Sequence, residues 1–289
     1  MTELTLGNAS NVAALAHQLA EAAAASAGVT VRTLNAPDEL SDAYELYKET
    51  WRPDASNLSM TLGILRVLAK TGNYVSGAYV GSKLVGMSVG FCEQPDQRCL
   101  HSHITGVSGS MRGRKVGQAI KLHQRAWALE SSMHTITWTV DPLVRRNAFF
   151  NIVKLGALPT EYLPNFYGQM DDAINGSDAS DRLLITWDLV SDIVGSSSPG
   201  SPEHELPRLK ATELIVTDAN GYPHVSVATE STVVSVATPD DIESLRRTQP
   251  GAAREWRSVV RECFMSEFAS GSRVMGLDSR GSYILRRPA

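Results

Sequence analysis

No stretch of about 18 uncharged apolar residues occurs in this chain of 289 residues, so no membrane-spanning helix is expected. The three cysteines, Cys92, Cys99 and Cys263, neither pair evenly nor show metal-ligand spacing, which argues against a disulfide framework or a metal site. The chain has no basic excess either, because 27 Lys and Arg stand against 31 Asp and Glu, and no basic stripe with interleaved aromatic residues indicates a nucleic-acid surface. These absences favour a protein of the reducing cytoplasm that binds neither nucleic acid nor a membrane.

What the sequence does contain is a succession of helix and strand patterns. The alanine-rich start lacks the basic leader of a secretory signal and predicts an amphipathic helix from about Ser10. Two apolar runs around Gly81-Ser82-Lys83 predict a hairpin. Further strands are predicted at 29–34, 100–107, 135–140 and 182–189, and further helices at 38–51, 60–72, 116–131, 144–157 and on either side of Pro250. This order of elements predicts an α/β fold.

The composition changes past Leu189, where serine, glycine and proline become frequent. We therefore expect a first domain over residues 1–190, a linker over 191–208 and an α+β extension over 209–289. An extension of roughly 80 residues is small for an independent core, so we expect it to pack on the first domain.

One turn carries the strongest chemical signal. In "VSGSMRGRKVGQAIKL", residues 107–122, a strand leads through a glycine-rich turn into a helix. The first N–H groups of a helix have no intrahelical acceptor, and the helix dipole adds positive charge beside them. Cations and glycines that let a ligand approach the main chain stand at Arg112, Gly113, Arg114, Lys115 and Gly117. The turn predicts a phosphate or pyrophosphate site, with an ordinary basic surface turn as the alternative.

This turn resembles the acyl-CoA pyrophosphate loop of the GNAT superfamily of N-acyltransferases, whose pattern is Arg/Gln-x-x-Gly-x-Gly/Ala. Arg112 takes the first position and Gly117 the last, while Lys115 replaces the first glycine; a register that starts at Arg114 also fits. The stretches "LHSHITGV", "TWTVDPLVRRNAFFNIVKLGA", "YLPNFYGQM" and "DRLLITWDL" resemble a bacterial GNAT group with a C-terminal extension. The resemblance covers about residues 30–287.

The resemblance implies a mixed, mostly antiparallel sheet splayed at its middle strands, flanked by helices, with a smaller α+β extension. It implies acetyl-CoA or another acyl-CoA as co-substrate and a small-molecule amine, for example an amino acid, as acceptor. The amine would attack the thioester directly in a ternary complex. The main chain of residues 112–117, Val116 included, would hold the pyrophosphate, the Val107 N–H the thioester oxygen, and Asn147 and Asn151 the pantetheine amides.

Two histidines are candidates for the base that deprotonates the amine. Alternation along the strand predicts that His101, His103, Thr105 and Val107 share one face. His101 is favoured slightly, because several GNAT enzymes place a carboxylate six residues before the carbonyl-binding position. The alternative for each histidine is a hydrogen-bonded core residue, and Glu93 is a weaker candidate base.

The proton donor for the leaving thiolate is less clearly marked. Many GNAT enzymes use a tyrosine at the position that Ile152 occupies here. Tyr167 is the best substitute, with Tyr162 behind it, and water is the alternative; for Tyr162, packing is the favoured interpretation. Because Cys99 lies close to His101, a covalent acyl-enzyme is a further alternative, although no cysteine has the setting of a nucleophile.

Two other classes of function stay open. Lys115 and Ile152 depart from the usual pattern, which motivates a catalytically silent acyl-CoA sensor or structural partner. Acetylation of a protein or peptide is the third hypothesis.

The C-terminal extension and the helix before it leave further alternatives. The extension closes the acceptor pocket, forms a homodimer interface or covers a sheet face. Arg254, Arg257 and Arg261 share one helical stripe, for which a solvated face is favoured over a site for an acceptor carboxylate. Arg145 and Arg146 either meet the adenosine phosphate or face water.

Overall fold

The computed structural model describes residues 3–52, 60–168, 178–190, 210–218, 221–226 and 230–288, with side chains from residue 11 onward. The chain forms two compact units, Met1–Trp138 with Trp187–Pro199, and Thr139–Thr186 with Gly200–Ala289. The linker expected over residues 191–208 lies outside the described residues. The domain boundaries that we expect from composition therefore stay a prediction.

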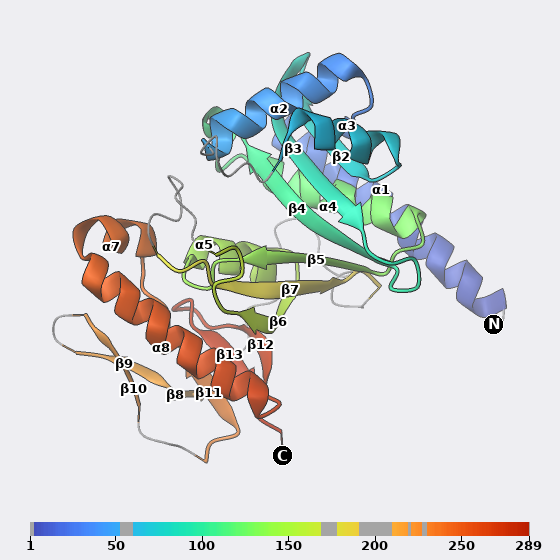
Figure 1. The fold of residues 1–289 in the computed structure, drawn as a ribbon. Coiled ribbons are helices and arrows are strands. Elements are labelled where there is room, and N and C mark those ends of the chain that lie inside the picture. Colours follow the sequence, from blue (N-terminus) through green and yellow to red (C-terminus); the bar gives the residue numbers. More distant parts are fainter. Residues whose placement is uncertain are drawn as a thin grey trace. The chain divides into compact units, whose positions relative to one another are not determined.

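The first unit holds the N-terminal helices and most of the large sheet (Figure 1). Its elements are α1 (Glu3–Ala27), β1 (Thr30–Thr33), α2 (Pro37–Trp51), α3 (Leu62–Lys70), β2 (Tyr74–Val80), β3 (Lys83–Cys92), β4 (Cys99–Val107), η1 (Gly109–Met111), α4 (Val116–Glu130) and the start of β5 (Thr135–Val140). Each of these helices and long strands lies where the sequence pattern predicts it, although α1 begins earlier than the expected Ser10.

A seven-stranded sheet runs in the order β1-β2-β3-β4-β5-β7-β6. The β1-β2, β2-β3, β3-β4 and β6-β7 pairs are antiparallel and the β4-β5 pair is parallel. Helices flank this sheet, and smaller sheets follow near the C-terminus, so the expected mixed, mostly antiparallel α/β fold class is confirmed. No helix within the described ranges is long and apolar enough to cross a membrane.

The two faces of the sheet in the first unit are covered by different helices. One face carries α4, since a Cβ added at Gly86 of β3 would lie 2.8 Å from the side chain of Ile120. The other face carries α2 and α3, whose Leu40 and Leu65 share a buried apolar cluster with Val89 of β3. The two faces therefore offer different surroundings to alternate residues of β4.

A bulge in β4 changes which residues share a face. The β3-β4 register shifts between Val89, which pairs with Ile104, and Gly90, which pairs with Ser102. Ser102 accepts a hydrogen bond from Lys121 of α4, and three residues later Thr105 bonds Ser88, which accepts from Gln124 of α4. Residues three apart lie on one face only where an extra residue interrupts the alternation.

The prediction that four alternate residues of β4 share one face is therefore wrong. His101 and His103 both contact the ring of Phe91, at 5.3 and 5.6 Å between ring centroids. Thr105 and Val107 are turned to the α4 face, because the bulge at His103 reverses the alternation. The two histidines stay together, but on the face opposite to Thr105.

The second unit joins the far end of the sheet to the C-terminal segment. Its elements are α5 (Arg145–Ala148), the π-helical turn η2 (Phe149–Lys154), β6 (Leu158–Leu163), most of β7 (Arg182–Asp188), β8 (Thr212–Glu213), β9 (Ile215–Thr217), β10 (Pro223–Val225), β11 (Val233–Val236), α7 (Ile242–Thr248), α8 (Pro250–Ala269), β12 (Arg273–Leu277) and β13 (Tyr283–Arg286). The sheets β10-β9 and β12-β13-β11-β8 belong to the C-terminal segment. Both α8 and β12 contact β6.

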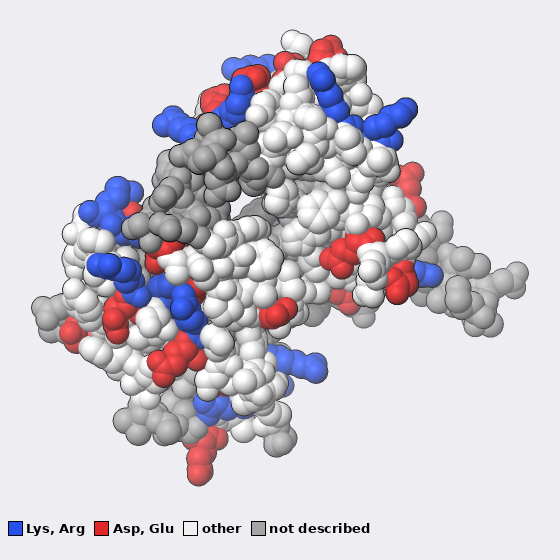
Figure 2. All heavy atoms as spheres, in the orientation of Figure 1, with Lys and Arg blue, Asp and Glu red and all other residues white. Residues whose placement is uncertain are grey.

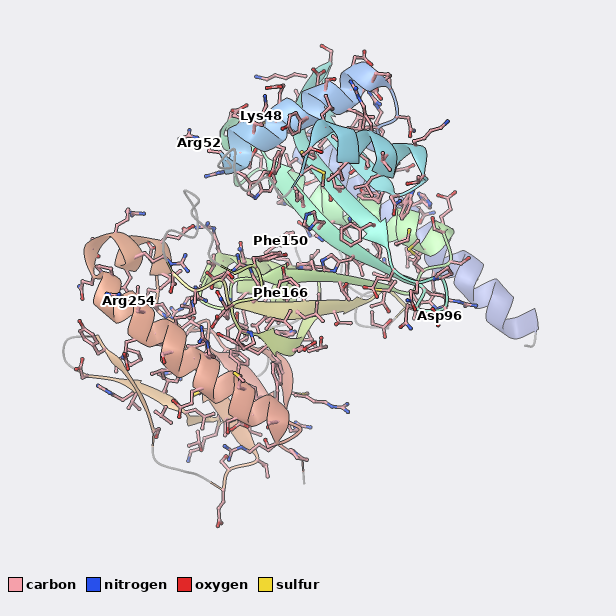
Figure 3. The ribbon with its side chains drawn as sticks, viewed as in Figure 1. Lys48, Arg52, Asp96, Phe150, Phe166 and Arg254 are labelled. Carbon is pink, nitrogen blue, oxygen red and sulfur yellow. The ribbon has the colours of Figure 1, made fainter. Side chains whose placement is uncertain are left out.

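Two arginines of α8 pair with carboxylates, and of these Arg257 is buried while 35% of the Arg261 side chain is exposed. Arg257 is 3% exposed and donates to both oxygens of Asp141 at 2.8 and 2.9 Å and to Asp178 at 3.0 Å. Arg261 donates to both oxygens of Asp181. Only Arg254, labelled in Figure 3, is exposed as expected. Because an arginine almost never lies buried unless it is paired, the solvated face predicted for Arg257 is wrong, whereas Arg261 is partly exposed and paired with a carboxylate.

Other charged side chains of this unit also form ion pairs with one another. Figure 2 shows basic and acidic side chains interspersed over α7 and α8. Arg145 contacts Asp240, and Arg146 contacts Glu243 at the start of α7. These two arginines therefore meet carboxylates of the C-terminal segment, where the sequence left a phosphate and water as the alternatives.

Candidate active site

The turn between β4 and α4 presents unsatisfied hydrogen-bond donors. The N–H of Ala119 makes the first bond of the helix, to the carbonyl of Lys115. Five preceding main-chain N–H groups have no acceptor in the part of the chain that the structure describes, those of Gly113, Lys115, Val116, Gly117 and Gln118. Donors of this kind at a helix start, together with the helix dipole, favour an anion.

The turn has room and charge for such an anion. A Cβ placed on Gly113 or Gly117 would meet no atom within 4 Å, so the main chain is open to a ligand at both positions. Arg112, Arg114 and Lys115 are exposed and form no ion pair with any described residue. No Asp or Glu occurs between Val107 and Glu130. This set of donors fits a diphosphate.

Lys115 takes the conformation that glycine adopts most easily. Its φ of 62° and ψ of 8° lie in the left-handed region, where a side chain is strained by roughly 1–2 kcal/mol. The resemblance places a glycine at this position, and the lysine keeps the backbone shape that a glycine permits. The departure from the pattern therefore places a lysine side chain on a backbone in the left-handed conformation.

Within the described residues, only the first part of β4 pairs with β5. Its parallel pairing with β5 runs from Cys99–Thr135 to His101–Thr137, while its pairing with β3 continues to Val107. The Ser108 N–H donates to the Val85 carbonyl at 2.9 Å. Since alternate residues of an antiparallel strand bond to opposite sides, the Val107 N–H points to the edge where pairing with β5 has ended. This is the orientation that the predicted contact with a carbonyl oxygen requires.

The His101 imidazole lies in a chain of polar contacts. Its Nδ1 is 3.0 Å from the Thr137 hydroxyl oxygen of β5. The Thr137 hydroxyl donates to Oε1 of Glu93 at 3.2 Å. Burial, and secondarily the charge of His103, lower the pKa of His101, which keeps the ring neutral near pH 7. A neutral, half-buried imidazole is suited to accept a proton.

Cys99 also contacts Glu93, and this contact weakens the acyl-enzyme alternative. The thiol donates to Oε1 of Glu93 at 3.3 Å. Burial, together with the hydrogen bond and charge of Glu93, raises the pKa of Cys99 to about 12. Because the thiolate is the nucleophile, a thiol held protonated at neutral pH is a poor one.

Thr137 is not among the residues that the sequence singles out, and Glu93 is there only as a weaker candidate base. Glu93 is exposed, as a strand-end carboxylate usually is, yet its Oε1 accepts from two side chains. Thr137 comes from a strand that follows α4, so its contact with His101 depends on the order of strands in the sheet. The sequence signal for Thr137 is its place on the partly exposed face of the strand "TITWTV".

The second unit holds the other predicted site residues. Tyr167 is 38% exposed, and its hydroxyl lies 2.9 Å from Oγ1 of Thr139. Tyr162 is buried, donates to Asp181 at 2.7 Å and stacks on Phe264, so its packing role is confirmed. Tyr167 stays a predicted proton donor.

The two candidate asparagines and Ile152 lie around the π-helical turn. Asn147 is half-buried at the end of α5, while Asn151 is 3% exposed within η2. Neither caps a helix start, because Val144 is the N-cap of α5. Ile152 is buried. The contacts predicted for the asparagines with pantetheine stay predictions.

No protein-family model matches this chain, and no curated protein matches it. Similar solved structures exist. A putative acetyltransferase of the GNAT family from Desulfovibrio desulfuricans is 10% identical, with a TM-score of 0.44, and the match covers 56% of this chain and 99% of that one. The structure of yncA, a putative acetyltransferase from Salmonella typhimurium with its cofactor acetyl-CoA, is 12% identical, with a TM-score of 0.45 and coverage of 56% and 94%.

An aminoglycoside 6'-acetyltransferase type Ii is 16% identical, with a TM-score of 0.46 and coverage of 56% and 98%. Nearly the whole of each of these structures is matched, but the match covers little more than half of this chain. Similarity at these identities and TM-scores adds nothing to the case for a function, which rests on the geometry of the site.

Proposed function

We propose that the protein is an N-acyltransferase that moves an acetyl or other short acyl group from acyl-CoA to the amine of a small molecule. The observation that carries this proposal is the set of five N–H groups between Gly113 and Gln118 without an acceptor, beside three cations that form no ion pair with any described residue. Such a turn suits the diphosphate of coenzyme A, and the sequence resemblance assigns it that role.

The first unit supplies two further groups that acyl transfer needs. The Val107 N–H stabilises the charge that develops on the thioester oxygen when the amine attacks the carbonyl carbon. His101 takes a proton from the attacking amine at Nε2, directly or through water. The bond from carbon to sulfur then breaks and the departing thiolate is protonated, a step for which the sequence leaves water and Tyr167 as alternatives.

Thiol release with a panel of small amines tests this function. Purified protein with acetyl-CoA should release free thiol only when an acceptor is present, and mass spectrometry should find the acetylated amine. His101→Gln should lower kcat by about 100-fold or more, because general-base catalysis typically contributes that much. His134→Gln, at an exposed histidine of the same unit, is the matched control and should leave kcat unchanged.

Other outcomes separate the alternatives. Binding of acetyl-CoA with no thiol release across the panel would contradict an enzyme of small amines and favour a sensor. Release only with peptides carrying a free amine would favour acetylation of a protein. Turnover that survives in His101→Gln would remove His101 from the mechanism.

A further inference from the structure

The polar chain that ends at His101 determines which ring nitrogen carries the proton. Thr137 has one hydroxyl proton. The hydroxyl donates this proton to a hydrogen bond with Oε1 of Glu93, which is 3.2 Å from the threonine oxygen. The Thr137 oxygen can therefore only accept from the imidazole, whose Nδ1 is 3.0 Å away. In a neutral ring a proton on Nδ1 leaves Nε2 with its lone pair.

Two further contacts hold Glu93 where it accepts the hydrogen bond of Thr137. The Cys99 thiol donates to the same oxygen at 3.3 Å, and the Glu93 main-chain N–H donates to the Cys99 carbonyl at 3.0 Å. Glu93 follows β3, Cys99 and His101 lie on β4, and Thr137 lies on β5. Three adjacent strands thus fix the chain of contacts where the pairing of β4 with β5 ends.

The charged and titratable groups around His101 are few. His103 and Lys121 disfavour the imidazolium, Glu93 favours it, and burial disfavours it most. The ring of Phe91 packs against the imidazole at 5.3 Å. Glu93 is therefore the one group in this set that favours a positive charge on His101, and Thr137 lies between the two.

We propose that Thr137 and Glu93 are positioning residues that hold His101 as the Nδ1–H tautomer, with Nε2 free to accept the proton of the acceptor amine. This inference rests on the proposed function for its catalytic meaning, while the tautomer is a property of the protein alone. The carboxylate acts through the Thr137 hydroxyl: by accepting a hydrogen bond from this hydroxyl it makes the Thr137 oxygen a stronger acceptor for the Nδ1–H when the imidazolium forms.

Nuclear magnetic resonance of 15N-labelled histidine tests the tautomer without any substrate. The His101 signals are assigned by their absence in His101→Gln. The wild-type protein above the titration of His101 should show a protonated Nδ1 and an unprotonated Nε2. Thr137→Ser keeps the hydroxyl and should keep this pattern, whereas Thr137→Val, of the same shape, should move the ring toward the Nε2–H tautomer. An Nε2–H tautomer in the wild type, or an identical pattern in Thr137→Val, would overturn the proposal.

The kinetic arm measures the catalytic consequence. Thr137→Val should lower kcat about tenfold with KM for acetyl-CoA unchanged, in the range seen when a supporting residue is lost. Its acidic limb of kcat/KM should move to lower pH, because the imidazolium loses an acceptor. Glu93→Gln should act in the same direction, and Thr137→Ser should restore kcat. A limb that does not move in Thr137→Val would refute positioning through His101.

The two arms separate failure of this inference from failure of the proposed function. An Nδ1–H tautomer that depends on Thr137, in a protein that acylates no amine, would leave the tautomer assignment standing and remove the acyltransferase. Turnover that needs His101 but not Thr137 would support the acyltransferase and contradict the positioning of His101 by Thr137.

Discussion

The ε-amine of Lys121 is buried between α4 and the large sheet. Lys121 on α4 is 4% exposed; its Nζ donates to Ser102 at 2.8 Å and to Gln124 at 3.1 Å, and lies 3.8 Å from the centre of the Trp138 ring. Burial lowers the pKa of this amine from 10.5 to about 7. A lysine within a helical pattern is usually expected to face solvent. The burial of Lys121 becomes evident only from its contacts with Ser102 of β4 and Trp138 of β5.

This burial predicts that stability depends on pH. The unfolded chain holds the Lys121 proton up to about pH 10.5, and the folded chain releases it near pH 7. Between these values the unfolded state binds more protons, so this group makes the free energy of unfolding rise with pH, by about 1.4 kcal/mol per pH unit at most. Below pH 7 the destabilisation by Lys121 is fully present.

Urea unfolding at pH 7.5, 8.0 and 8.5 measures this slope. Lys121→Met should flatten the dependence relative to the wild type, because the titrating group is gone. Lys70→Met, at an exposed lysine of the same unit, is the matched control and should keep the wild-type slope. Equal slopes in the wild type and Lys121→Met would show that Lys121 is protonated in the folded state.

At the scale of elements, the sequence pattern predicts the positions of α2, α3, α4, α7 and α8 and of the long strands, because helices and strands differ in the period of their apolar residues. It fails where contacts between elements decide. The β4 bulge depends on pairing with β3, so alternation alone misassigned Thr105. Arg257 pairs with Asp141, which lies 116 residues away in sequence, and with Asp178, which lies 79 residues away.

Within the second unit, Arg257 joins α8 to Asp141 and Asp178 through buried ion pairs. Although burial by itself raises the pKa of Asp141, its hydrogen bonds and charge interactions with Arg257, and then with Arg246, lower it overall. Arg257→Met leaves this carboxylate with one arginine fewer, and breaking a buried pair in this way typically costs about 3–5 kcal/mol. Arg254→Met, on the exposed side of the same helix, should change stability by about 0.5 kcal/mol or less.

Denaturant unfolding followed by hydrogen exchange in α8 compares the two variants. Arg257→Met should lower the free energy of unfolding and speed exchange in α8 and β6. Similar stabilities for Arg257→Met and Arg254→Met would mean that the buried pairs do not hold the helix.

At the scale of the whole molecule, the chain divides within the large sheet, whereas composition places the boundary in the segment after Leu189. The first unit contains the turn from Arg112 to Gln118, Val107 and His101, and the second contains Tyr167, Asn147 and Asn151. The sequence alone indicates the turn, because glycines, cations and a helix start are local features. The Glu93–Thr137–His101 chain needs three strands in the right order, which a local pattern does not contain.

The proposed function requires that the turn from Arg112 to Gln118 binds the diphosphate of coenzyme A. Isothermal calorimetry with acetyl-CoA tests it most directly, on the wild type, on the double variant Arg112→Glu with Arg114→Glu, and on a control of equal charge change, Arg66→Glu with Lys70→Glu, at exposed positions of α3. The wild type and the control should both bind acetyl-CoA. The affinity of the turn variant should be about 100-fold lower, since each charged hydrogen bond contributes roughly 1.5–3 kcal/mol. No heat with the wild type, or equal affinity in all three proteins, would contradict it.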